Sequence, residues 1–159
     1  MALRNGIHTL AKDLHGDQGA TRRPVVYTIL VLDDSLGFLW WLGQSLGNAG
    51  YQVLPAQSPR EARAWVTSRR IKTDVLIVDL ALPGAVEFTQ SLQAKWHPRV
   101  IALADAQGSD HRPAFLEVDG IGWRPAGLVA DQKAEDEAVR QWLSLVRSVL
   151  EGGRTFGAT

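Results

Sequence analysis

The 159-residue chain contains no cysteine. This absence excludes disulfide bridges, thiolate metal ligands and a cysteine nucleophile. Neither sign of charge is in excess, because 17 Lys and Arg residues are balanced by 17 Asp and Glu residues. A balanced charge gives no long-range attraction to nucleic acid or to an anionic membrane surface, so we expect neither as a partner.

Long apolar runs are also missing. No stretch approaches the roughly 20 residues needed to cross a bilayer, and the N-terminus has no continuous apolar core of the kind found in secretory signals. We therefore expect a cytoplasmic protein. The length suits one domain, which we place at residues 25–151, between a flexible N-terminal tail (1–24) and a short C-terminal tail (152–159).

The most informative stretch present is an apolar run that ends on a carboxylate. Residues 75–78 read Val-Leu-Ile-Val and are followed by Asp79, with a Pro-Gly turn signal shortly after. Such a short run, rich in β-branched residues, is typical of a strand buried on both faces of a parallel sheet. The apolar segment 25–32 ends in the same way, on Asp33 and Asp34. Parallel strands end at one edge of the sheet, where open α/β folds bind their ligands, so we expect the three acids to meet.

The rest of the chain alternates in the same manner. Each of five expected strands is followed by a segment with helical spacing of its apolar residues. This order predicts a doubly wound parallel sheet with helices on both faces. The other expected strands are 51–54, 100–104 and 121–123, and the expected helices are 36–49, 58–70, 88–95, a short one near Pro113 that includes Phe115 and Leu116, and a long one at about 131–150.

These acids and turns resemble those of a known family, the CheY-like receiver domains of two-component response regulators. The likeness covers roughly residues 26–151 and implies a flavodoxin-like fold with sheet order 2-1-3-4-5. It also implies a role in phosphorelay signal transduction, with a sensor histidine kinase or a phosphotransfer protein as partner. The resemblance rests on Asp33-Asp34, Asp79, Leu82-Pro83-Gly84 and the Arg124-Pro125 pair.

The resemblance assigns chemistry to these residues. Clustered carboxylates repel one another, and a hard divalent cation removes that cost. By analogy Asp34 and Asp79 hold Mg²⁺, Asp33 acts directly or through water, and the backbone carbonyl of Ala81 completes the ligand set. Asp79 is the implied phosphoacceptor, and Arg124 is the cation that contacts the phosphoryl group. No enzymatic activity is expected beyond Mg²⁺-dependent self-phosphorylation and dephosphorylation of Asp79.

Three positions depart from the family pattern. Ala104 stands where receivers have a Ser or Thr hydroxyl, Arg124 replaces a lysine, and Ile121 replaces a switch aromatic residue. Two plain interpretations also stay open at this stage. Asp34 could simply cap the following helix, together with Ser35, and Arg124 could form an ion pair with Asp79 that closes the site without phosphate.

These departures leave alternative functions open. One is a degenerate pseudo-receiver, a protein-interaction module that works without phosphorylation. A small phosphatase of another α/β family is less favoured, because no general base accompanies Asp79 in a recognisable pattern. Homodimerisation through the last helix is a further prediction, since its apolar face is broad, and Trp40 is expected to be exposed on the first helix. The apolar residues of the last helix are Val139, Trp142, Leu143, Leu145, Val146, Val149 and Leu150.

Overall fold

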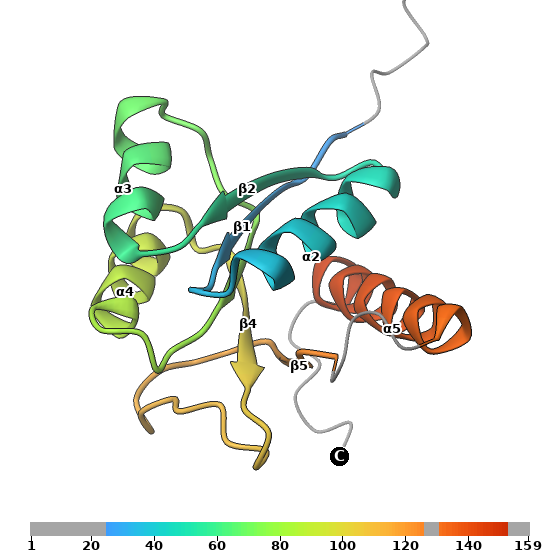
Figure 1. Ribbon diagram of the computed structural model, residues 1–159. Helices are drawn as coiled ribbons and strands as arrows, with labels where there is room; N and C mark the ends of the chain where they lie inside the picture. The colour runs from blue at the N-terminus through green and yellow to red at the C-terminus, as the bar shows by residue number, and fades with distance from the viewer. Residues whose placement is uncertain (1–24, 126–130, 153–159) are drawn as a thin grey trace, which may run out of the picture.

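A computed structural model describes residues 25–125 and 131–152. Five parallel strands form one sheet in the order β2-β1-β3-β4-β5, which confirms the predicted topology (Figure 1). Parallel pairing of strands that alternate with helices follows from the right-handed crossover that each βα unit makes. The strands are β1 (Thr28–Leu32), β2 (Gln52–Ala56), β3 (Val75–Val78), β4 (Arg99–Ala104) and β5 (Gly120–Trp123).

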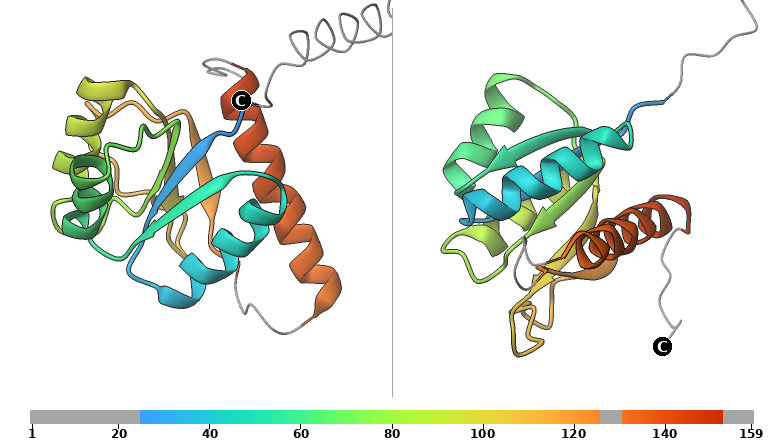
Figure 2. Two further views of the ribbon diagram at one scale, coloured as in Figure 1. Left: turned by 90° about the horizontal axis from the view of Figure 1, so that it is seen from above. Right: turned by 45° about the vertical axis from the view of Figure 1, so that its right-hand side comes forward.

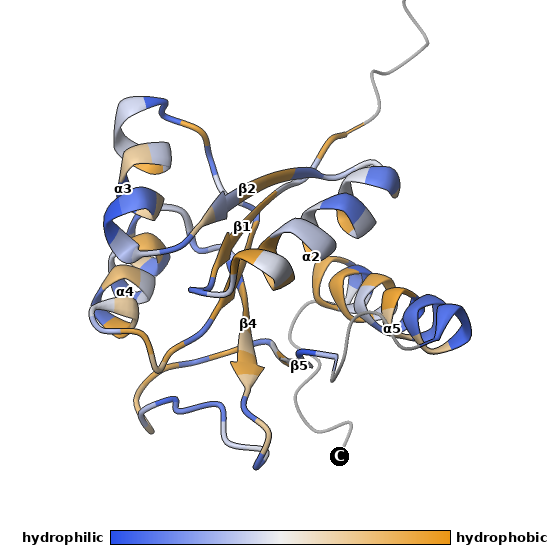
Figure 3. Ribbon diagram, in the orientation of Figure 1, coloured by the Kyte–Doolittle hydropathy of each residue, from blue (hydrophilic) through white to orange (hydrophobic). Residues whose placement is uncertain are grey.

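Helices cover both faces of this sheet. Helices α2 (Leu36–Asn48) and α5 (Gln132–Glu151) lie on one face, and α3 (Pro59–Ser68) and α4 (Ala85–Trp96) lie on the other (Figures 1 and 2). Alternate residues of the inner strands supply the two core layers, as the two-residue period of a strand requires. Apart from Thr28 and Arg99, with which β1 and β4 begin, the inner strands are apolar, whereas the helices expose hydrophilic positions (Figure 3).

The helix starts follow local sequence signals. Ser35 caps α2, and its hydroxyl accepts a hydrogen bond from the Phe38 amide at 3.3 Å. Ser58 caps α3 in the same way through the Glu61 amide at 3.2 Å. Each cap satisfies a backbone N–H that the first helical turn leaves unpaired. Because Ser35 has this role, Asp34 is not the helix cap.

One predicted helix is wrong. Residues 105–119, between β4 and β5, contain no helix, and only a turn from the Leu116 amide to the Pro113 carbonyl (3.0 Å) marks the expected position. Asp side chains bind the backbone amides of residues 107, 109 and 112, which favours loop over helix. The remaining residues before β5 are too few for a stable helix. Leu116 and Val118 instead pack into the α3/α4 face of the core.

Strand β5 lies at one edge of the sheet. A Cβ added to Gly122 would lie 2.2 Å from the Trp142 ring, so this glycine allows α5 to approach the strand closely. The Trp142 indole also donates to the Trp123 carbonyl at 3.0 Å. Since Gly122 faces α5, its neighbours Ile121 and Trp123 alternate to the other side of the strand, and they are 40% and 56% exposed.

Packing of α5 bears on the homodimer prediction. Trp142 is buried, and the other apolar residues of the helix pack in or against the same core layer. Packing within one chain thus accounts for the broad apolar face of α5. This face gives no support to homodimerisation, which stays a prediction. Trp40 is 68% exposed, as expected.

Two further expectations concern the ends of the chain and membranes. The tail predicted at 1–24 and most of the tail predicted at 152–159 lie outside the described residues. Among the helices that the structure describes, none combines the length and apolar character that a bilayer span requires.

Candidate phosphoryl and metal site

Two carboxylates follow β1. The backbone amide of Asp33 donates to the Ala56 carbonyl of β2 at 3.1 Å, which extends the strand pairing by one residue. The Asp33 side chain is completely buried, whereas Asp34 is exposed. The buried strand therefore presents one carboxylate inside the sheet edge and the next one toward solvent.

Asp79 follows β3, the neighbouring strand. Its amide donates to the Leu32 carbonyl at 2.9 Å, and its Oδ1 accepts a hydrogen bond from the Ala81 amide at 3.0 Å. Ligand oxygens of Asp33, Asp34 and Asp79 lie within 4.8 Å of one another. The predicted convergence of the three acids is thus present.

Arg124 reaches this cluster from the end of β5. Its Nε and Nη2 donate to the two carboxylate oxygens of Asp33, with the Nε bond at 3.1 Å, and Nη2 also donates to Asp79 Oδ2 at 2.9 Å. The guanidinium carbon lies 5.8 Å from the centre of the Phe38 ring. The ion pair considered from the sequence exists, but Asp33 is its main partner and Asp79 the second.

Burial dominates the electrostatics of Asp33. It raises the pKa of this carboxyl, the hydrogen bond and charge of Arg124 lower it, and the neighbouring acids raise it again. The same hydrogen bond raises the pKa of Arg124. The buried carboxylate thus depends on a cation, and Arg124 supplies one from within the chain.

The donor set fits a hard divalent cation. Three carboxylates offer oxygen ligands within a few ångströms, and the Asp33 and Asp79 oxygens that accept from protein N–H groups each keep a second lone pair. Ala81 is positioned here by the hydrogen bond that its amide donates to the Asp79 carboxylate. The metal-binding role of its carbonyl remains a prediction.

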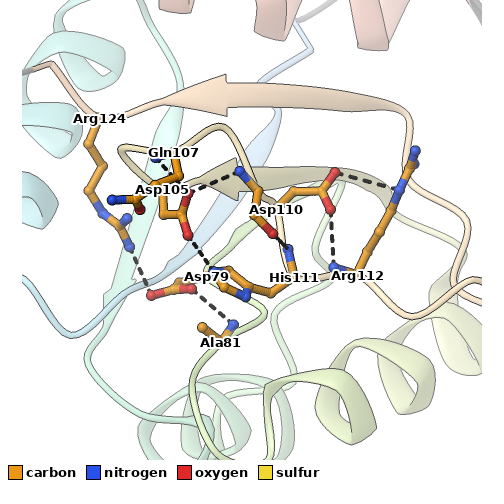
Figure 4. Close-up of polar contacts among 9 residues, drawn as sticks. Asp79, Ala81, Asp105, Gln107, Asp110, His111, Arg112 and Arg124 are labelled. Atoms are coloured by element: carbon orange, nitrogen blue, oxygen red, sulfur yellow. Dashed lines mark hydrogen bonds and ion pairs between the residues drawn. The ribbon is translucent and has the colours of Figure 1, made fainter.

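The end of β4 carries no hydroxyl. Ala104 is buried and paired with Trp123, and Asp105 follows it. Asp105 Oδ1 accepts from the amides of Gln107 (2.9 Å) and Ser109 (3.0 Å), and its Oδ2 lies 2.7 Å from His111 Nε2 (Figure 4). The hydrogen bond from Ser109, aided by those from His111 and Gln107, lowers the pKa of Asp105.

Sequence reasoning missed two of these side chains. Phe38 is a single aromatic residue in the first turn of α2, and nothing in its spacing connects it with Arg124, which is 86 positions away. His111 lies in a polar loop where the Asp-rich composition predicts turns but not which side chains meet. The one available signal was the six-residue separation of Asp105 and His111, which suits a compact loop.

Comparison with solved structures identifies the fold. CheY4 of Vibrio cholerae matches with a TM-score of 0.54 and 21% sequence identity, over 77% of this chain and 99% of that chain. A response regulator from Thermotoga maritima matches with a TM-score of 0.54 and 17% identity, over 78% of this chain and 100% of that chain. A complex of CheY6 with the P1 domain of CheA3 from R. sphaeroides matches with a TM-score of 0.60 and 21% identity, over 78% of this chain and 99% of that chain.

At these identities the likeness shows the fold alone: the chain has the architecture of CheY-like receiver domains, with low sequence similarity. No protein-family model matches the sequence, and no curated protein matches it significantly. The chemistry of the site therefore has to be argued from its own residues.

Proposed function

We propose that this chain is a receiver domain of a two-component phosphorelay that accepts a phosphoryl group on Asp79. The observation that supports this function is the convergence of Asp33, Asp34 and Asp79 with the Arg124 guanidinium at the carboxyl edge of a receiver-type sheet. Acidic ligands for a cation and a guanidinium beside a nucleophilic carboxylate are the parts that phosphoryl transfer requires.

Asp79 is prepared for this reaction by its two neighbours. The Ala81 amide and the Arg124 guanidinium each hold one carboxylate oxygen. An oxygen of Asp79 attacks the phosphorus of a phosphohistidine or a small phosphodonor, and the bond from phosphorus to the donor breaks. Arg124 then has a new partner for its N–H groups, since guanidinium pairs with phosphate as well as with carboxylate.

The proposed cofactor is Mg²⁺, which Asp33, Asp34, Asp79 and the Ala81 carbonyl would hold. When bound, it offsets the negative charge of the transferring group. Within the chain itself, Arg124 already offsets part of the charge on Asp33 and Asp79.

A histidine kinase or a phosphotransfer protein is the proposed partner. Among the structurally similar proteins, CheY6 forms a complex with the P1 domain of CheA3. A partner of this kind would present its phosphohistidine to the edge where Asp79 lies.

The test is incubation with acetyl phosphate and Mg²⁺, followed by intact mass measurement. We expect the mass of one added phosphoryl group, lost completely in Asp79→Asn. Asp110→Asn is a matched control, because this acid lies in the nearby loop and binds Arg112 rather than the cluster. A chain that takes no label from a small donor or a phosphorylated kinase would favour the interaction module that works without phosphorylation.

A further inference from the structure

The loop after β4 contains a carboxylate–imidazole pair that the proposed function does not use. We propose that His111, oriented by Asp105, is a general base that hydrolyses the aspartyl phosphate on Asp79 and so limits its lifetime. This inference rests on the proposed function, because it requires phosphorylated Asp79. It assigns a second, hydrolytic step to the same sheet edge.

The pair has the arrangement of a base with its orienting group. Asp105 Oδ1 already accepts two backbone hydrogen bonds, and its Oδ2 lies 2.7 Å from His111 Nε2. An ionised carboxylate can only accept, so the proton is on Nε2 and the lone pair of the neutral ring is on Nδ1. Among the described residues, Nδ1 has no hydrogen-bond partner and is therefore available to a water molecule.

The loop is placed where such a base is needed. Strands β3 and β4 are neighbours with Val78 opposite Ala102, so the loop that starts at Asp105 begins just beyond the level of Asp79. In Figure 4 the His111 ring points from this loop toward Asp79 and Ala81. Attack on a phosphoryl group occurs in line, opposite the bond that breaks, so the water must come from the open side of the site. The His111 side chain is 42% exposed, so its ring is accessible to water.

The backbone of His111 adopts a conformation that is uncommon outside glycine. Its φ is +56°, in the left-handed region that non-glycine residues seldom adopt. The contacts at this residue are the ring bond to Asp105 and a hydrogen bond from its amide to the Ser109 hydroxyl at 3.3 Å. A residue kept in such a conformation by its side-chain contacts is typical of functional sites.

The other charged side chains near the His111 imidazole pair with one another, and its charged partner is Asp105. Asp110 pairs with Arg112, and Arg124 pairs with Asp33 and Asp79. Asp105 is therefore the carboxylate that stabilises the imidazolium formed when His111 takes a proton.

The step balances as a hydrolysis. The water oxygen forms a bond to phosphorus while its proton passes to His111 Nδ1. The bond from phosphorus to the Asp79 oxygen breaks, and its electron pair stays on the regenerated carboxylate. Inorganic phosphate leaves, and the imidazolium returns its proton to solvent.

The experiment measures the decay of the phosphorylated full-length chain. The protein is labelled with acetyl phosphate and Mg²⁺, the donor is removed, and loss of the phosphoryl mass is followed with time. We expect His111→Gly to lengthen the half-life about 100-fold, the low end for a general base. Glycine accepts a positive φ, so this variant removes the imidazole without straining the loop. Added imidazole should shorten the half-life of His111→Gly and leave that of the unmodified chain unchanged.

Two further variants make the result specific. His97→Gly is a matched control, since His97 also has a positive φ (+50°) but ends α4 just before β4, at the opposite end of that strand from Asp105, and it should leave the half-life unchanged. Asp105→Asn keeps the shape of the loop, but its amide presents an N–H to His111 Nε2 and favours the tautomer with the proton on Nδ1. We therefore expect its half-life to lie between that of the unmodified chain and that of His111→Gly.

Each outcome decides a separate point. A long half-life in His111→Gly that imidazole shortens supports the general base. An unchanged half-life, or a long one that imidazole does not shorten, overturns this inference and leaves the phosphoacceptor role intact. A chain that takes no label on Asp79 overturns the proposed function and this inference together.

Discussion

The two halves of the carboxyl edge of the sheet differ in what they contain. The ends of β1 and β3 provide a compact acidic cluster that is bound by Arg124. The ends of β4 and β5 provide Ala104 without a hydroxyl, an exposed Ile121 and a connection without a helix.

The comparison teaches that charge balance and conformational response are separable properties. A buried carboxylate must have a counter-charge whatever else the domain does, so the acidic half is tightly constrained. A hydroxyl or an aromatic ring that moves toward the phosphoryl group contributes only to the conformational change on phosphorylation, and the fold forms without either group. We therefore expect the loss of the counter-charge to have a larger effect than the addition of the missing hydroxyl.

Arg124→Ala should have the largest effect. It leaves the buried Asp33 carboxylate without its cation, which destabilises proteins by about 3 kcal/mol at the low end for broken buried pairs. We place Arg124 at this low end because its side chain is 29% exposed. Urea denaturation at neutral pH, with EDTA present, measures the loss. Arg124→Ala combined with Asp33→Asn should recover most of it, because an amide needs no counter-charge.

The same variant predicts a pH dependence with a defined sign. Burial raises the pKa of Asp33 in the folded state above the unfolded value of about 3.9, and removing Arg124 takes away the largest opposing effect. The folded state then binds the proton more tightly than the unfolded state, so the destabilisation is absent below the unfolded pKa and grows as the pH rises through the folded pKa. A deficit in Arg124→Ala that is equal at acidic and neutral pH would contradict this account of Asp33.

Gly122→Ala should have the next largest effect. The added methyl group would lie 2.2 Å from the Trp142 ring and would force α5 away from β5, at a cost of about 1–3 kcal/mol. Gly47→Ala is a matched control in α2, where no atom within 4 Å meets the new Cβ, and there we expect a gain of up to about 1 kcal/mol. Urea denaturation measures the change in the free energy of unfolding for both variants. Changes of the same sign would contradict the close approach of Trp142 to Gly122.

Ala104→Thr tests the missing hydroxyl. A donor at the end of β4 should help to stabilise the transferring oxygens, and we expect labelling of Asp79 to become about tenfold faster, or about 1.4 kcal/mol. Single donors are worth more in some enzymes, but Arg124 already contacts this site. Labelling rates with acetyl phosphate measure the effect, and Ala104→Val controls for the added bulk. Equal rates for the Thr and Val variants would show that the hydroxyl does not contribute.

Phe38→Leu should have the smallest effect on the site. It removes a buried ring that lies 5.8 Å from the Arg124 guanidinium, and because the Arg124 side chain is 29% exposed we take this cation–π interaction at the lower range of about 0.5–1 kcal/mol. We expect labelling of Asp79 to slow by a factor of a few. Phe115→Leu is the control, since Phe115 is 67% exposed and lies outside the cluster. A rate for Phe38→Leu equal to that of the control would remove Phe38 from the description of the site.

Local patterns in the sequence determined most of the fold. The apolar runs of β1 and β3 predict buried parallel strands because only a sheet covered on both faces can hide every residue of such a run. The Ser-Pro start of α3 and the glycine after the first helix mark where helices begin and end. Acids placed directly after two such strands predict their own convergence, since all strands of a parallel sheet end at one edge.

Only the tertiary structure decided which of these groups are partners. Arg124 makes two hydrogen bonds to Asp33 and one to Asp79, although β3 lies nearer than β1 to β5 in the sheet, and no spacing in the sequence encodes this choice of partner. In place of the helix expected near Pro113 the chain forms a loop, in which Asp105 and Asp110 bind amides that precede Pro113, and apolar periodicity does not report such local hydrogen bonds. The same loop brings His111 to Asp105. Side-chain pairing across loops and strands depends on the folded geometry, and the sequence by itself determined only the edge where that pairing takes place.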